Sequence, residues 1–171
     1  MERMSSEEIR NKIEIYKDIW TNLNTTNCYA YALGLDIPEK DICKHAYQPG
    51  VMSGFYALEE DYFSYDNLVK GINHDLEFLK IEAREIDPSD IINPDEWKIA
   101  LFVHNSIFCP PYLIPDYHFL KYYPDETWHH KFGYTYSINN LVDNSSVIIN
   151  PKCCQLDGFV YDKTLSLKLK K

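Results

Sequence analysis

Residues 25–34 read TTNCYAYALG, a stretch that places a cysteine between a polar segment and a short aromatic and aliphatic run. The polar residues favour a loop, and the run from Cys28 to Leu33 favours a helix. We expect this helix to end at Gly34, because glycine readily takes the conformation that follows a helix end. Cys28 is then the first helical residue. A thiol there is either an ordinary buried side chain or a nucleophile whose pKa is lowered by the helix dipole.

The chain has 171 residues, of which 45% are hydrophobic, and this predicts one globular domain over residues 1–171. The net charge of -9 argues against a nucleic-acid partner, which requires clustered Lys and Arg. The first residues, MERMSSEEIRNK, lack the apolar core of a signal peptide, and no stretch approaches the roughly 20 apolar residues of a membrane span. We therefore expect a soluble protein of the cytoplasm or, for an effector, of a host cytosol.

The cysteine count is odd and the spacing is irregular, so the sequence implies no disulfide framework. This usage is typical of a reducing compartment. The five cysteines are Cys28, Cys43, Cys109, Cys153 and Cys154.

The order of elements predicts an α+β fold, because helical patterns come first and strand patterns follow. Residues 36–54 and the segment CPPYLIPD, residues 109–116, are expected to be loops. Residues 165–171, LSLKLKK, are expected to be a strand end or a solvated tail. Helices are expected near residues 5–20, at 28–33 and from 64 onward, and strands at 76–82, 97–104, 117–123, 127–131, 146–150 and 158–161.

A nucleophilic thiol needs a base, and histidine is the usual one. His118 lies in the segment YHFLKYY, and His129 and His130 follow after the turn sequence YPDE. Two strand patterns joined by such a turn predict a hairpin. The hairpin brings His118 near the other two histidines on adjacent strands.

Four blocks together resemble a family of papain-like proteins related to the NlpC/P60 cysteine peptidases. They are TNCYAYAL at 26–33, QPG at 48–50, DYHF at 116–119 and TWHHKFGYT at 127–135. In that family a segment close to N-C-Y-x-Y-A-L precedes D-Y-H-[WF]-Y and W-S-H-K-P-G segments. The resemblance covers roughly residues 25–151.

The resemblance implies a papain-like, NlpC/P60-like α+β fold with N-terminal helices packed on an antiparallel sheet. It implies that Cys28 is the nucleophile, that His118 is the base, and that His130 matches the histidine of the W-S-H-K block. His129 and Phe132 stand where the family has Ser and Pro, so the choice between His129 and His130 stays open. Candidates for the residue that orients the base are His130, Asn140 and Asp143, and the QPG block implies a substrate loop with Gln48 and Gly50.

The predicted function is a thiol-dependent hydrolase or acyltransferase that acts on an amide, isopeptide or ester bond. The Cys28 thiolate attacks the carbonyl, and the backbone N–H of Cys28, with Asn24 or Asn27, holds the oxyanion. Water or an amine then resolves the thioacyl enzyme. The expected partner is a peptide, a protein or a small amide or ester, and no cofactor is expected.

Two other functions fit the same residues. One is a catalytically inactive binding or structural protein on this scaffold, because a fold does not guarantee an activity. The other is a zinc-binding domain. The usual C-x-x-C pairs of structural zinc are lacking, so we expect no metal site. Zinc ligands would come from His104, His118, His129, His130 and the Cys153-Cys154 pair.

Overall fold

The structure is a computed structural model that describes most of the chain. The described residues are 5–16, 28–35, 48–55, 65–109, 112–123, 126–130, 148, 150–154 and 158–171, with the backbone alone at 105–109, 112–116 and 130.

Helix α1, Ser6–Tyr16, begins as the sequence predicts and buries Ile9 and Ile13. The Ser5 hydroxyl accepts from the Glu8 amide at 3.2 Å, and the Glu8 carboxylate accepts from the Ser5 amide at 2.7 Å. This reciprocal pair is a capping box, which satisfies amides that the first helical turn leaves open. The expected end of the helix, at 17–20, lies outside the described residues.

Helix α2, Cys28–Leu33, confirms the predicted short helix, and Gly34 ends it with a φ of 83°. Helix α3, Tyr65–Phe78, is also confirmed at its start. The strand predicted at 76–82 is wrong in its first half, because the apolar stripe of α3 continues through Leu76. Strand β1 starts later and covers Ile81–Ile86.

The strands form one antiparallel sheet in the order β1-β5-β2-β3-β4. β2 is central, as expected for residues 97–104. Residues 165–169 are the end of β5, which pairs with β1 and β2, so the strand end that the sequence predicts is confirmed for them. The loop expected at 109–116 is wrong in part, because its two ends belong to β2 and β3. The bounds are Glu96–Cys109 for β2, Tyr112–Tyr122 for β3, Trp128–His130 for β4 and Val160–Leu169 for β5.

Two of the remaining strand predictions are borne out only in part. Of residues 146–150 the structure describes 148 and 150, and Ile148 forms an isolated bridge with Trp128. Of residues 158–161, Val160 and Tyr161 begin β5. The N-terminal helices packed on a five-stranded antiparallel sheet confirm the α+β class.

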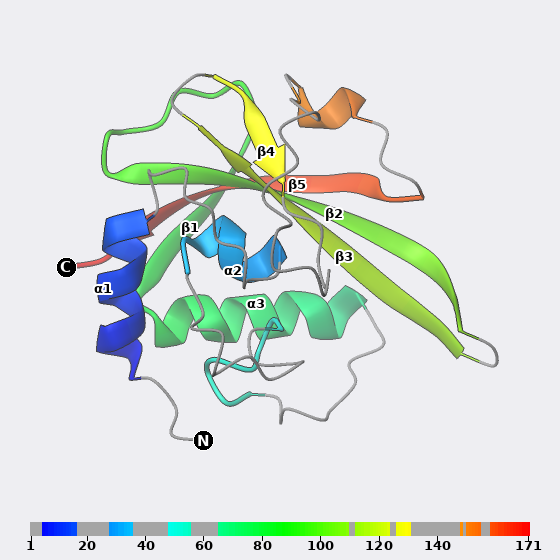
Figure 1. Ribbon diagram of the computed structural model, residues 1–171, viewed down its shortest axis with the longest axis horizontal. Coiled ribbons are helices and arrows are strands. Elements are labelled where there is room, and N and C mark those ends of the chain that lie inside the picture. The colour runs from blue at the N-terminus through cyan, green and yellow to red at the C-terminus, as the bar shows by residue number, and fades with distance from the viewer. Residues whose placement is uncertain are drawn as a thin grey trace, which may run out of the picture.

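The two faces of the sheet bury different clusters. α2 and α3 lie on one face, and the 3-10 helix η2, Pro151–Cys153, lies on the other (Figure 1). Neighbouring residues of a strand point to opposite faces. The helix-side face therefore buries Ile99, Leu101, Phe119 and Leu167, and the outer face buries Ala100, Phe102, Leu120 and Trp128.

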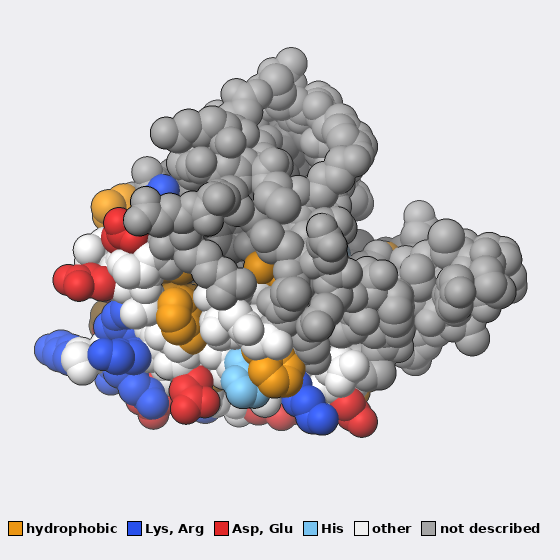
Figure 2. Space-filling view, turned by 90° about the horizontal axis from the view of Figure 1, so that it is seen from below, with side chains coloured by type: hydrophobic (Ala, Val, Ile, Leu, Met, Phe, Trp, Pro, Cys, Tyr) orange, Lys and Arg blue, Asp and Glu red, His pale blue; other side chains and the backbone are white. Residues whose placement is uncertain are grey.

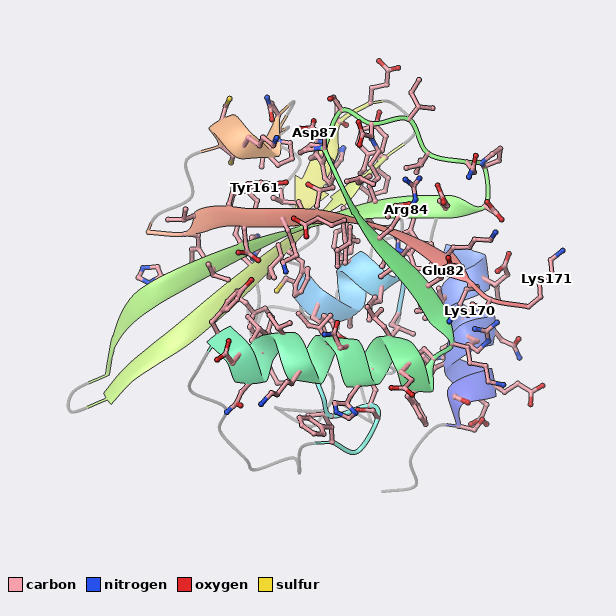
Figure 3. All side chains as sticks on the ribbon, turned by 180° about the vertical axis from the view of Figure 1, so that it is seen from behind. Glu82, Arg84, Asp87, Tyr161, Lys170 and Lys171 are labelled. Atoms are coloured by element: carbon pink, nitrogen blue, oxygen red, sulfur yellow. The ribbon has the colours of Figure 1, made fainter. Side chains whose placement is uncertain are left out.

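The end of β5 is fastened to α1. The Arg10 guanidinium donates to the carbonyls of Leu79 at 2.5 Å and of Lys80 at 2.8 Å, and also to the carbonyl of Lys170. Figure 3 shows Lys170 and Lys171 beside α1, where β5 leaves the sheet. One side chain therefore joins the first helix, the end of α3 and the last strand.

A backbone contact at Gly71 of α3 is the basis for a stability test. A Cβ on Gly71 would lie 2.6 Å from the Pro49 carbonyl oxygen and 2.8 Å from its carbon. Gly71→Ala gains about 1 kcal/mol of helix propensity but costs about 1 to 3 kcal/mol by overpacking against backbone that cannot rotate away. We expect a net loss of stability in urea denaturation. Lys70→Ala, an exposed position of the same helix, is the control, and a Gly71→Ala protein as stable as wild type would contradict this packing.

Candidate functional site

Cys28 is the first residue of α2 and is 5% exposed. Its side chain belongs to the helix-side cluster, together with Tyr29 of the same helix and Phe119 of β3. The ring centroids of Tyr29 and Phe119 are 5.3 Å apart. The predicted nucleophile therefore lies at a helix start on the sheet, in a largely closed environment.

His118 faces the other side of the sheet. Its neighbour Phe119 points toward α2, and its partner across the strands is Phe102, a member of the outer cluster. The His118 ring lies 6.0 Å from the ring of Phe159, which packs against that same cluster. The structure therefore does not bring Cys28 and His118 to one face of the sheet.

The predicted hairpin of the other two histidines is confirmed, with Lys121 paired to His129 and Leu120 to His130. His129 is 8% exposed and lies on the helix side, where its ring meets the Tyr123 ring edge-on at 4.4 Å. The Thr127 hydroxyl is 2.7 Å from His129 Nε2. Among the histidines whose side chains are described, His129 is the one on the α2 face of the hairpin.

A polar group beside His129 was missed by the sequence reasoning. The Tyr31 hydroxyl of α2 is hydrogen-bonded to the Tyr123 hydroxyl, and burial raises the pKa of Tyr31. The Lys121 ammonium, on a side chain only 1% exposed, lies 5.8 Å from the centre of the Tyr31 ring. The side chains of β3 alternate between the two faces of the sheet, and this alternation is the signal that could have placed Lys121 on the helix side.

The QPG block contacts β3 and α3. Gln48 Oε1 accepts from the Tyr117 hydroxyl of β3. Gly50 donates its amide to Asp75 Oδ2 at 2.7 Å. The block was predicted as a substrate loop, and it is fastened to β3 and α3.

Asp75 is the second functional candidate that the sequence reasoning missed. Its side chain is fully buried and accepts from the Tyr29 hydroxyl at 2.8 Å, from the Gly50 amide at 2.7 Å and from the Ser53 amide at 2.9 Å. A carboxylate next to Leu76, within the apolar stripe of α3, is the signal that could have identified it. A buried carboxylate is tolerated in a protein interior when several hydrogen-bond donors satisfy it.

Burial raises the pKa of the Asp75 carboxyl above its ordinary value of 3.8, although the three donors each lower it. The desolvation of the charged form is therefore larger than the combined effect of the donors.

Figure 2 shows the described part of the surface seen from below, where acidic and basic side chains are intermixed rather than gathered in a basic stripe.

Four predicted site residues, Asn24, Asn27, Asn140 and Asp143, lie outside the described residues. For the zinc reading, no group of three or more His, Cys, Asp or Glu side chains within the described parts could hold a metal ion. Cys153 is exposed and Cys154 is partly buried in and beside η2. Within the described ranges, no helix is long and apolar enough to span a bilayer.

Comparisons with known proteins give no family for this chain. No family model, no curated protein and no solved structure matches it.

The pKa of Asp75 predicts a pH-dependent stability. Because the folded protein keeps a proton that the unfolded chain releases near pH 3.8, stability falls as pH rises from there through the higher folded pKa, and it is constant above. Asp75→Asn removes this titration. We expect the free energy of unfolding of wild type, relative to Asp75→Asn, to fall over this interval in urea denaturation at several pH values. A difference that rises with pH would show that the three donors outweigh burial.

Proposed function

We propose that this protein is a thiol-dependent hydrolase or acyltransferase of the papain-like kind, with Cys28 as its nucleophile. The observation that supports this is the position of Cys28 at the start of a helix that packs on β3 and β4, the hairpin that bears three histidines. The described parts of the four sequence blocks of the resemblance fall on or beside these elements. An α+β scaffold of this kind is what a Cys–His enzyme of that family needs.

The two candidates for the base lie on opposite faces of the sheet. The resemblance assigns His118, whose ring packs toward the outer cluster. His129 lies on the α2 face, where its ring and the ring of Tyr31 both pack on Tyr123. Tyr31 is one helical turn beyond Cys28 in α2. We propose His129 as the base, because proton transfer requires both groups on one side of the sheet.

The reaction proceeds in two steps. The imidazole takes the Cys28 proton, and the thiolate adds to the carbonyl carbon of an amide, isopeptide or ester. The amine or alcohol then leaves with that proton and a thioester remains. Water or an amine attacks the thioester and restores the thiol. Because the Cys28 residue is only 5% exposed, neighbouring residues must move before a substrate reaches the sulfur.

The second candidate is a catalytically inactive binding protein on the same scaffold. The observations that favour it are the closed environment of Cys28 and the orientation of His118 toward the outer cluster of the sheet. In that case the Cys28 thiol is a small apolar core group, which is common for free cysteine.

Selective alkylation tests the proposal. We expect iodoacetamide near pH 7 to label Cys28 faster than its burial alone allows, at a rate comparable with the exposed Cys153, because a nearby imidazole increases the thiolate fraction. His129→Ala is expected to slow Cys28 labelling about tenfold, the effect of one unit of thiol pKa. His118→Ala is the matched control, and peptide mapping by mass spectrometry measures each site.

Three outcomes are distinct. Slowing by His118→Ala and not by His129→Ala would support the base that the resemblance assigns. Labelling of Cys28 only on unfolding would support the binding protein. Labelling of Cys28 in the folded protein at a rate that neither histidine variant changes would contradict the Cys–His mechanism.

A further inference from the structure

The buried carboxylate of Asp75 joins two elements that carry predicted site residues. Its Oδ2 atom accepts from the Tyr29 hydroxyl and from the Gly50 amide, so these two donors lie side by side. Tyr29 follows Cys28 directly in α2, and Gly50 is part of the QPG block. Asp75 is thus shared between the helix of the nucleophile and the predicted substrate loop.

The turn at residues 48–55 is held at further points. The Ser53 amide donates to Asp75 Oδ1 at 2.9 Å, and Gly71 admits the Pro49 backbone because it has no Cβ. At the start of the turn, Gln48 accepts from the Tyr117 hydroxyl of β3. The turn therefore spans from α3 to β3.

The aromatic side chains continue this connection to α2. The Tyr117 ring meets Phe119 edge-on at 5.7 Å, and Phe119 packs on Tyr29 at 5.3 Å. Asp75, the turn, β3 and α2 thus form a closed circuit of contacts. Gln48 and the start of α2 are therefore linked by two routes, one through Asp75 and one through Tyr117 and Phe119.

We infer that Asp75 is a positioning residue, which holds the Gln48–Gly50 segment as the wall of the Cys28 site against which a substrate carbonyl is oriented. This inference rests on the proposed function. Asp75 itself does not touch the reacting atoms. It acts through Tyr29 on the helix and through the amides of Gly50 and Ser53 on the turn.

Two reagents separate positioning from access to the thiol. p-Nitrophenyl acetate acylates Cys28 by addition to a carbonyl, which forms a C–S bond, breaks a C–O bond and releases p-nitrophenolate. Iodoacetamide reacts with the same thiol by displacement at carbon and needs no oriented carbonyl. The ratio of the two rate constants therefore reports on the wall of the site, and a general loss of stability changes both rates together.

We expect Asp75→Asn to lower the ratio of acylation to alkylation about tenfold, because small displacements of a substrate-positioning group are costly. Tyr29→Phe removes one of the three donors and is expected to lower the ratio about threefold. Asp66→Asn, an exposed acid in the first turn of α3, is the control and should leave the ratio unchanged. If Asp75→Asn does not fold, the Tyr29→Phe ratio decides.

The failures are distinguishable. If wild-type Cys28 is acylated no faster than the exposed Cys153, the proposed function fails and the inference fails with it. If wild-type Cys28 is acylated selectively and both variants keep the wild-type ratio while their melting temperatures fall, the inference alone is overturned. Asp75 would then be a structural residue.

Discussion

Helix α2 is buried on every side, and the rest of the structure is built around this burial. Each of its six side chains, from Cys28 to Leu33, is 5% exposed or less. A helix of this length is not stable in water by itself, because nucleation is unfavourable and few hydrogen bonds repay it. It exists because the sheet and its surroundings remove it from water. Its position is therefore set by packing and not by helix propensity.

Because α2 is buried, each polar side chain that it directs into the interior needs a hydrogen-bond partner. An unpartnered hydroxyl in the interior costs about 1 to 3 kcal/mol. The Tyr29 hydroxyl is satisfied by Asp75, and the Tyr31 hydroxyl by Tyr123. The first of these solutions introduces a carboxylate into the core, and the Gly50 and Ser53 amides then offset part of its desolvation. The polar network at the start of α2 thus follows from the burial of one tyrosine.

The sequence predicts local features of this fold better than its pairings. Cys28–Leu33, the central strand at 97–104 and the histidine hairpin follow from short-range patterns and agree with the structure. The sequence predicts a strand end at residues 165–169 but not its place between β1 and β2, because that place depends on partners about 70 to 90 residues away. Asp75 was overlooked for the same reason. Its donors come from segments that no spacing in the sequence connects to α3.

Whether Cys28 and a histidine of β3 lie on the same side of the sheet depends on the alternation of side chains along the strand. In β3, a residue that faces α2 is followed by one that faces the outer cluster. Phe119 packs on Tyr29, so His118 is directed away from the helix, and Lys121 and Tyr123 are directed toward it. A motif such as DYHF conveys which residue types are present but does not by itself fix the face that each occupies. The face is fixed by the large aromatic side chain that the core accepts, and here that side chain is the phenylalanine next to the histidine.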